Sequence, residues 1–249
     1  MAAMLAACGE VTAPPSHASE TPATSSPSVT TSDPELVPLH SPPVLALDDV
    51  PLMCGSPLDF GVDALDGPPG AEMADHPAAR SLRRLMADSP LPERSGWRLV
   101  VFNEDGALFL LPDTSEEGVS FWHAEIGPAT ADWQPVRWGQ CTLQPAFEGI
   151  AAARWELAPG ERVGPDTEAV DVSVFERACA SGASPEGRIV GPAVIPLEES
   201  IIVILGTRPP PGPQTCLTGP PAIVRVELPE PLGDRQLLDG STFPAEPRN

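Results

Sequence analysis

The sequence has no Lys, no Tyr and only two Asn, so Arg is its only strongly basic residue. Its 14 Arg stand against 35 acidic residues, which gives a formal net charge of −21. This balance excludes nucleic-acid binding by phosphate neutralisation, because that function needs an excess of basic side chains. No stretch approaches the ~20 apolar residues that a membrane-spanning helix needs. The missing residue types are typical of GC-rich coding and indicate no particular chemistry.

The sequence is also rich in Pro, which is poorly compatible with helices. Pro accounts for 34 of the 249 residues, well above the usual share of ~5%. Because Pro costs ~3 kcal/mol inside a helix, a long helical bundle is excluded. The length fits one domain, at most two, and the 41% of hydrophobic residues is enough to form a core.

Motifs of the common enzyme classes are missing as well. There is no Gly-x-Ser-x-Gly, Walker or dinucleotide-binding sequence, and no calcium loop. Only His76 and His123 lie in the globular part. His123 shares one face of an expected strand with Phe121 and Glu125, and we expect a solvent-facing polar pair there rather than a metal or proton-transfer site. The sequence therefore predicts no catalytic residue, no metal ligand and no cofactor, and favours a non-enzymatic role.

The amino-terminal residues Leu5-Ala6-Ala7-Cys8 resemble the lipobox of bacterial lipoproteins. The resemblance implies cleavage before Cys8 and a diacylglycerol on its thiol. Residues 1–8 are then a truncated signal peptide, since such peptides begin with a charged region and an apolar stretch of ~7–15 residues. We expect an extracytoplasmic protein that is anchored to the cell membrane through this lipid.

A Pro/Ser/Thr-rich segment follows Cys8. Between Val11 and Leu45 there are 8 Pro and 12 Ser or Thr, with no aromatic residue. Such a composition cannot bury enough apolar surface to offset the entropy of ordering. We predict a disordered tether over 9–45 and a single globular domain over 46–249, whose first part, 46–75, is an irregular Pro/Gly-rich lead-in.

The sequence has five Cys, an odd number, and lipidation of one of them would leave an even number for disulfides. If Cys8 carries lipid, then Cys54, Cys141, Cys179 and Cys216 remain, and four Cys allow three pairings. We favour disulfides Cys179–Cys216 and Cys54–Cys141. The alternative is buried free thiols that pack as small hydrophobic residues.

The pattern of the globular part predicts a mainly β fold. Residues 77–88 have apolar side chains at helical spacing and predict one short helix that packs on the sheet. Strands are expected at 97–102, 107–111, 119–126, 134–143, 152–157, 169–177, 201–207 and 222–228. The wholly apolar run 201–205 indicates a central strand. Many short strands between Pro/Gly turns favour an antiparallel sandwich or barrel-like domain.

Trp residues cluster in the middle of the chain, at positions 97, 122, 133, 138 and 155. Most are expected to pack in the core. Trp133 and Trp138 lie next to Pro135 and Gly139, and we expect them to be the most exposed. They are therefore the candidate ligand-contact residues.

Segments of the carboxy-terminal half, at 175–182 (FERACASG), 226–235 (VELPEPLGDR) and 238–240 (LDG), carry a second resemblance. They resemble uncharacterised secreted or lipid-anchored proteins of high-GC actinobacteria. The resemblance implies an all-β extracytoplasmic domain and no particular activity.

The leading functional prediction is a lipid-anchored β-domain with a binding or cell-envelope structural role. One alternative is a secreted hydrolase with a dispersed active site, for which His123 would be the base. Another is a carbohydrate or small-ligand binder that uses the Trp cluster. The expected partners are the membrane, through the lipid, and an envelope protein or glycan, with no nucleic acid. We expect a monomer.

Overall fold

The computed structural model describes residues 43–92, 95–113, 120–130 and 132–248. The predicted lipobox with Cys8, and the predicted tether up to residue 42, lie outside these residues. Within them the protein is mainly β, as predicted, and α1 (Pro77–Asp88) is its one α-helix. No helix in the described part of the chain is long and apolar enough to cross a membrane.

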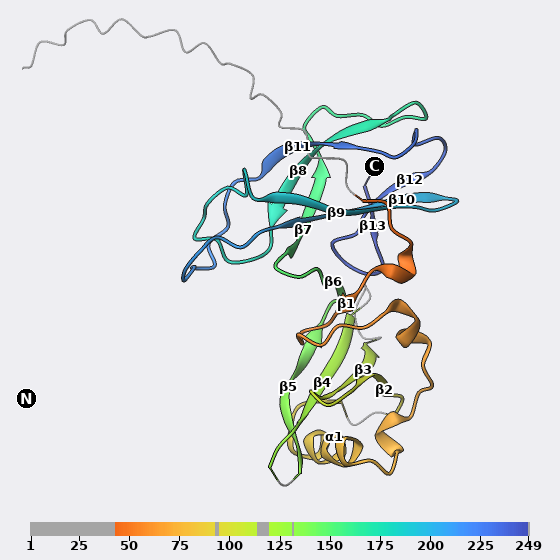
Figure 1. Ribbon diagram of the computed structural model, residues 1–249, viewed down its shortest axis with the longest axis vertical. Coiled ribbons are helices and arrows are strands. Elements are labelled where there is room, and N and C mark those ends of the chain that lie inside the picture. The colour runs from red at the N-terminus through yellow and green to blue at the C-terminus, as the bar shows by residue number, and fades with distance from the viewer. Residues whose placement is uncertain (1–42, 93–94, 114–119, 131, 249) are drawn as a thin grey trace, which may run out of the picture. The chain divides into compact units, whose positions relative to one another are not determined.

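An antiparallel sheet in the order β2-β3-β4-β5 carries α1 on one face (Figure 1). Its strands are β2 (Arg98–Phe102), β3 (Ala107–Asp113), β4 (Ser120–Pro128) and β5 (Trp133–Cys141). Phe109 and Ala124 are cross-strand neighbours on the helix side, where they pack with Leu82 of α1. The helix begins with Pro77 and is capped by His76, whose Nδ1 accepts the N–H of Ala78 at 3.2 Å.

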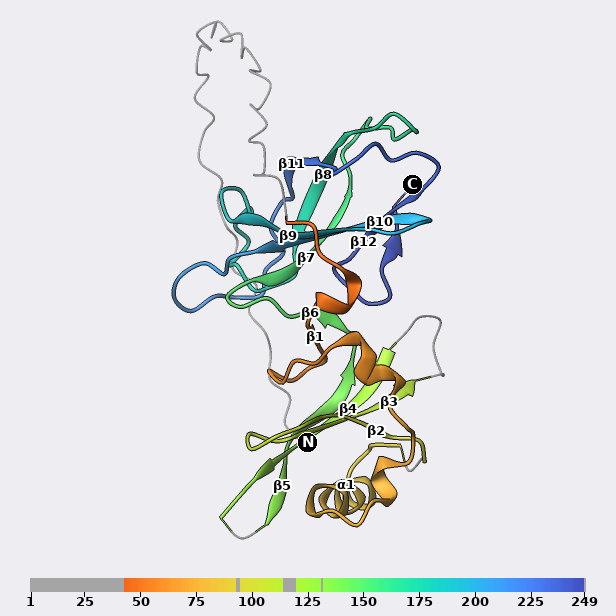
Figure 2. The same ribbon diagram turned by 45° about the vertical axis from the view of Figure 1, so that its right-hand side comes forward.

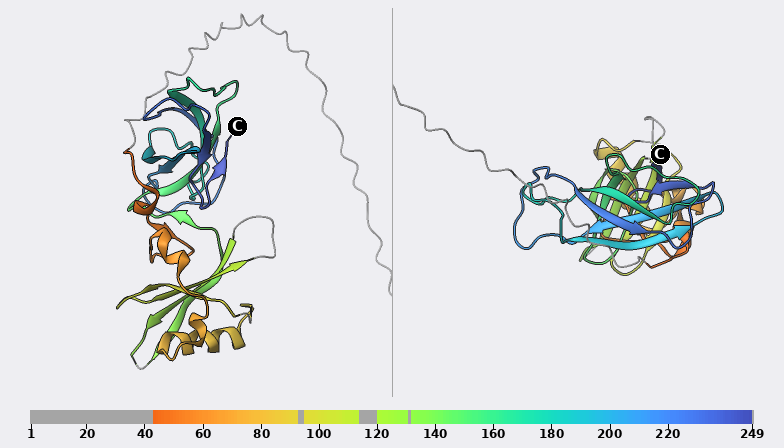
Figure 3. Two further views of the ribbon diagram at one scale, coloured as in Figure 1. Left: turned by 90° about the vertical axis from the view of Figure 1, so that its right-hand side faces the viewer. Right: turned by 90° about the horizontal axis from the view of Figure 1, so that it is seen from above.

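The lead-in covers the opposite face of this sheet. It forms three short 3₁₀ helices, η1 (Leu47–Asp49), η2 (Val62–Asp66) and η3 (Ala71–Met73), and strand β1 (Leu52–Met53), which pairs with β6 (Gln144–Pro145). Its apolar side chains pack against Leu108 and Leu110 of β3. The Cys54–Cys141 disulfide, with Cα atoms 5.4 Å apart, fastens the lead-in to β5. Figure 3 shows the lead-in, in orange, running alongside this sheet and a second sheet, which is described next.

The second sheet has the order β11-β8-β7-β10-β12-β13, and β9 pairs with β10. Its strands are β7 (Ala151–Leu157), β8 (Ala169–Glu176), β9 (Ile189–Pro196), β10 (Ser200–Thr207), β11 (Ala222–Glu227), β12 (Gln236–Asp239) and β13 (Glu246–Pro247). The central position expected for 201–205 is confirmed, since β10 is buried throughout. Two pairings depart from the antiparallel expectation, because β12 runs parallel to the first half of β10 and Val44 forms a parallel bridge with Val194 of β9.

Alternate residues of β10 serve two cores. Ile201 and Val203 pack in the interior of the second sheet. Ile202 and Ile204 face the other way and share a cluster with Leu108 and the lead-in. The alternation explains why this run has no polar position, since both faces of the strand are covered.

The last residues of the predicted tether belong to the folded part of the chain. Residues 43–45, assigned to the tether, belong to the second sheet, because the Val194 N–H donates to the Pro43 carbonyl at 2.9 Å and the Leu45 N–H donates to the Val194 carbonyl at 3.1 Å. The backbone of this short segment therefore extends the sheet beyond β9. The second disulfide joins Cys179 and Cys216, with Cα atoms 4.2 Å apart, so both favoured cysteine pairs are present.

Candidate functional site

An open groove runs between α1 and β5, with a volume of about 440 Å³. We call it the α1–β5 groove. Its walls include Ser81, Arg84 and Asp88 of the helix and Trp133, Gln134 and Trp138 of the strand. Figure 1 and Figure 2 both show α1 next to β5, which is an edge strand of its sheet. Both Trp residues predicted to contact a ligand therefore line one depression.

The register of β5 explains why two Trp residues an odd number of positions apart share a face. Trp133 lies opposite Pro128, and Trp138 lies opposite Ala124, on the helix side of β4. Simple alternation would send Trp138 to the other face. The register shifts in this part of the β4–β5 pair, as in a β-bulge, and returns Trp138 to the helix side.

The two groove Trp residues differ in exposure. Trp138 is 45% exposed, whereas Trp97 and Trp155 are fully buried. Trp133 is partly buried and stacks on Phe102, with ring centroids 5.6 Å apart. Trp133 is therefore held in place by its neighbours, and Trp138 presents free aromatic surface.

Some polar groups of the groove form hydrogen bonds or ion pairs, and others do not. Arg84 donates to Asp132 at 2.8 Å, and this hydrogen bond lowers the pKa of Asp132, with a smaller effect of the Trp133 N–H. The side chain of Asp88 makes no hydrogen bond or ion pair with the residues that the structure describes. Ser81 is 1% exposed, and its Oγ has no hydrogen-bond partner within the same residues. The groove therefore combines an aromatic plane with unused hydrogen-bonding capacity.

His123 lies on the opposite face of β4 and is 5% exposed, so the expectation of a solvent-facing pair with Glu125 was wrong. The lead-in folds over this face and places the backbone of Gly55 against the imidazole. Glu125, 7% exposed, forms an ion pair with Arg137 at 3.0 Å. The alternation of the strand was predicted correctly, but the sequence did not show that the lead-in covers this face of β4.

The His123 imidazole lies close to the backbones of Gly55 and Gly139. Neither ring nitrogen makes a hydrogen bond within the described residues. Burial lowers the pKa of His123, and the Gly139 backbone and the Glu125 carboxylate offset this only in part. A general base needs hydrogen-bond reach to its substrate, and the covered imidazole offers none. The position therefore does not support the hydrolase alternative.

No protein-family model matches this sequence, and no curated protein or solved structure is detectably similar to it.

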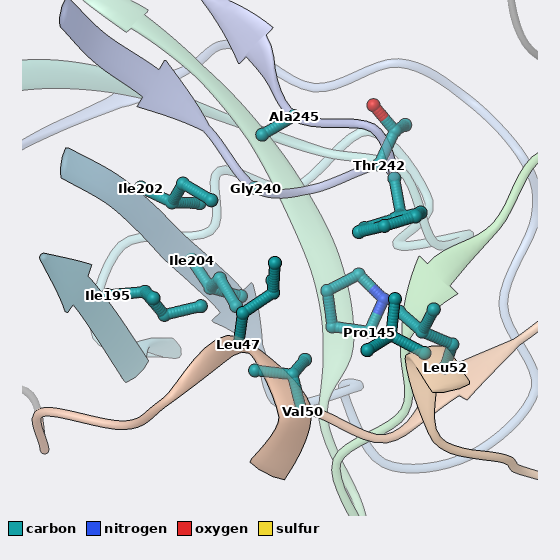
Figure 4. Close-up of a pocket in the computed structure, with 12 residues that line it drawn as sticks. Leu47, Val50, Leu52, Pro145, Ile195, Ile202, Ile204, Gly240, Thr242 and Ala245 are labelled. Atoms are coloured by element: carbon teal, nitrogen blue, oxygen red, sulfur yellow. The ribbon is translucent and has the colours of Figure 1, made fainter. Parts of the chain in front are cut away.

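A separate apolar cavity lies between η1 and the second sheet (Figure 4). Leu47, Val50, Ile195 and Ile204 line it, and its volume is about 20 Å³. That space is enough for about one water molecule. The cavity is a packing gap and not a ligand pocket.

An open acidic depression of about 1040 Å³ lies beside the β9–β10 turn. It includes Glu198, Glu199, Glu230 and Asp234, and Arg235 is paired with Glu230. Among the residues that the structure describes, no three or more His, Cys, Asp or Glu side chains are arranged to hold a metal ion. The depression has charge but no assembled site, so the α1–β5 groove is the better candidate.

Proposed function

We propose that this protein is an extracytoplasmic binding protein, held at the membrane by a lipid on Cys8, that presents the α1–β5 groove to a component of the cell envelope. The observation that carries the proposal is the exposed Trp138 beside the unpaired carboxylate of Asp88. Exposed aromatic residues in clefts with a few polar groups are typical of binding sites. Two disulfides support an oxidising compartment, and the resemblance of residues 5–8 to a lipobox supports the anchor.

The binding role is tested by sedimenting the full chain with insoluble cell-wall material from an actinobacterium. The unchanged protein is expected in the pellet, and Trp138→Ala in the supernatant. Leu217→Ala is the matched control, because Leu217 is a 64% exposed apolar residue outside the groove. Equal binding of Trp138→Ala and the unchanged protein, or no binding of either, would contradict the proposal.

The anchor is tested by mass spectrometry of the protein expressed from its own locus, with the DNA upstream of Met1 included. The mature chain is expected to begin at Cys8 and to carry acyl chains. Cys8→Ala should leave the membrane fraction. A mature chain that still begins at Met1 and lacks lipid would overturn the anchor without affecting the groove.

A further inference from the structure

We infer that the α1–β5 groove takes an uncharged glycan chain, an inference that rests on the proposed function and names its ligand. The first support is aromatic. Trp138 is 45% exposed on the helix side of β5. The face of an indole carries partial negative charge and attracts the weakly positive C–H groups that line one side of a sugar ring. The free indole thus provides a stacking surface without needing a ligand charge.

The second support is the polar lining. Asp88 is exposed in the groove and offers two acceptor oxygens, with no partner for its side chain among the described residues. These two oxygens can accept hydrogen bonds from neighbouring hydroxyls of a sugar.

Charge argues against an anionic ligand. The one Arg in the groove lining, Arg84, is already paired with Asp132. Asp88 then leaves the groove with a net negative charge, on a chain whose total is −21. An anionic polymer would be repelled both locally and by the whole molecule.

The edge of β5 argues against an added peptide strand. Pro135 has no N–H to donate across the edge, and the register shift interrupts the strand within the groove. Pro and bulges are devices that protect edge strands from pairing. A ligand is therefore expected to bind in the groove through side-chain contacts and not by main-chain pairing with β5.

The test is isothermal titration calorimetry of the full chain with three kinds of probe. The first is a set of neutral oligosaccharides of glucose, mannose, galactose, arabinose and N-acetylglucosamine. The second is a charged pair, glucosamine oligomers and hyaluronan fragments. The third is a peptide with the sequence of residues 133–141, which measures strand addition. At least one neutral oligosaccharide is expected to bind, and Trp138→Ala should weaken it by about tenfold or more. Asp88→Ala should weaken it by a smaller factor, and Leu217→Ala should leave it unchanged.

Salt provides a second readout. The affinity for the neutral oligosaccharide is expected to change by less than about twofold between low and high ionic strength, because salt screens only charged contacts. Binding only of the charged probes, only of the peptide, or of none would overturn the inference. If Trp138-dependent binding to cell-wall material persists in that case, the proposed function stands and only the ligand class is wrong. If that binding is also missing, both fail.

Discussion

His123 is a titratable side chain buried without a hydrogen bond, and this makes folding sensitive to pH. Burial lowers the pKa of His123 from 6.5 in the folded protein. The unfolded chain keeps the ordinary value, so it binds a proton at pH values where the folded protein does not. The free energy of unfolding should therefore fall as the pH drops below about 6.5, by at most ~1.4 kcal/mol per pH unit, and level off below the folded pKa.

Denaturant unfolding at pH 7.5 and pH 5.5 measures this loss. His123→Gln should flatten the pH dependence in that window, whereas His76→Gln, at the cap of α1, should retain it. Glu125 and Arg137 also face this side of the sheet and form an ion pair, and neither substitution removes either residue. An unchanged pH dependence in His123→Gln would show that another group is responsible.

Asp239 is a second buried titratable residue with a testable role. It is fully buried and accepts hydrogen bonds from the Ser241 N–H at 2.8 Å and from Arg248 at 2.9 Å. Asp239→Ala removes the carboxylate that neutralises Arg248, so it should lower the free energy of unfolding by about 3–5 kcal/mol. Glu246→Ala, which removes the 56% exposed second partner of Arg248, should cost less than about 1 kcal/mol. Similar losses for both variants would contradict this assignment.

At the scale of elements, the helix and the strands whose apolar residues recur with a clear local period were predicted from the sequence. The helix at 77–88 has the predicted bounds, and the eight expected strands are all present with small differences at their ends. β9 was missed because Gly191 and Pro192 interrupt its apolar pattern, although pairing with β10 makes it a strand. β12 was missed because it is only four residues long and gains its structure from parallel pairing. Local patterns cannot report such long-range partners.

The candidate site was predictable in part. Neighbouring Pro and Gly residues drew attention to Trp133 and Trp138, and both line the groove. The helix that forms the other wall was predicted, but its position next to β5 was not. The register shift that brings Trp138 to the helix side has no signal in the composition of β5.

The contact between the lead-in and β4 can be tested at Gly55. Its φ is +64°, and an added Cβ would lie 2.5 Å from His123 Cε1. Gly55→Ala should therefore cost about 2 kcal/mol or more, from backbone strain together with the clash. Gly70→Ala is the control for strain alone, since Gly70 has φ +95° and open space around it. A smaller loss for Gly55→Ala than for Gly70→Ala, measured by denaturant unfolding, would count against this packing.

At the scale of the whole molecule, the two disulfides constrain different parts of the chain. Cys54–Cys141 spans 87 residues and Cys179–Cys216 spans 37. Replacing either pair with Ala should lower the free energy of unfolding by roughly 3–5 kcal/mol. Only the loss of Cys54–Cys141 should also weaken the pH dependence below 6.5, because this bridge holds Gly55 over His123. Equal pH dependence in both variants would contradict that coupling.

The central claim, that the α1–β5 groove is the binding surface, is tested most directly by NMR of the indole N–H groups. Five Trp residues give five such signals, which single Trp→Phe variants would assign. During titration with solubilised cell-wall fragments, the signals of Trp138 and Trp133 should shift, while those of the buried Trp97 and Trp155 stay in place. Shifts confined to the buried residues, or no shift in any signal, would contradict the claim.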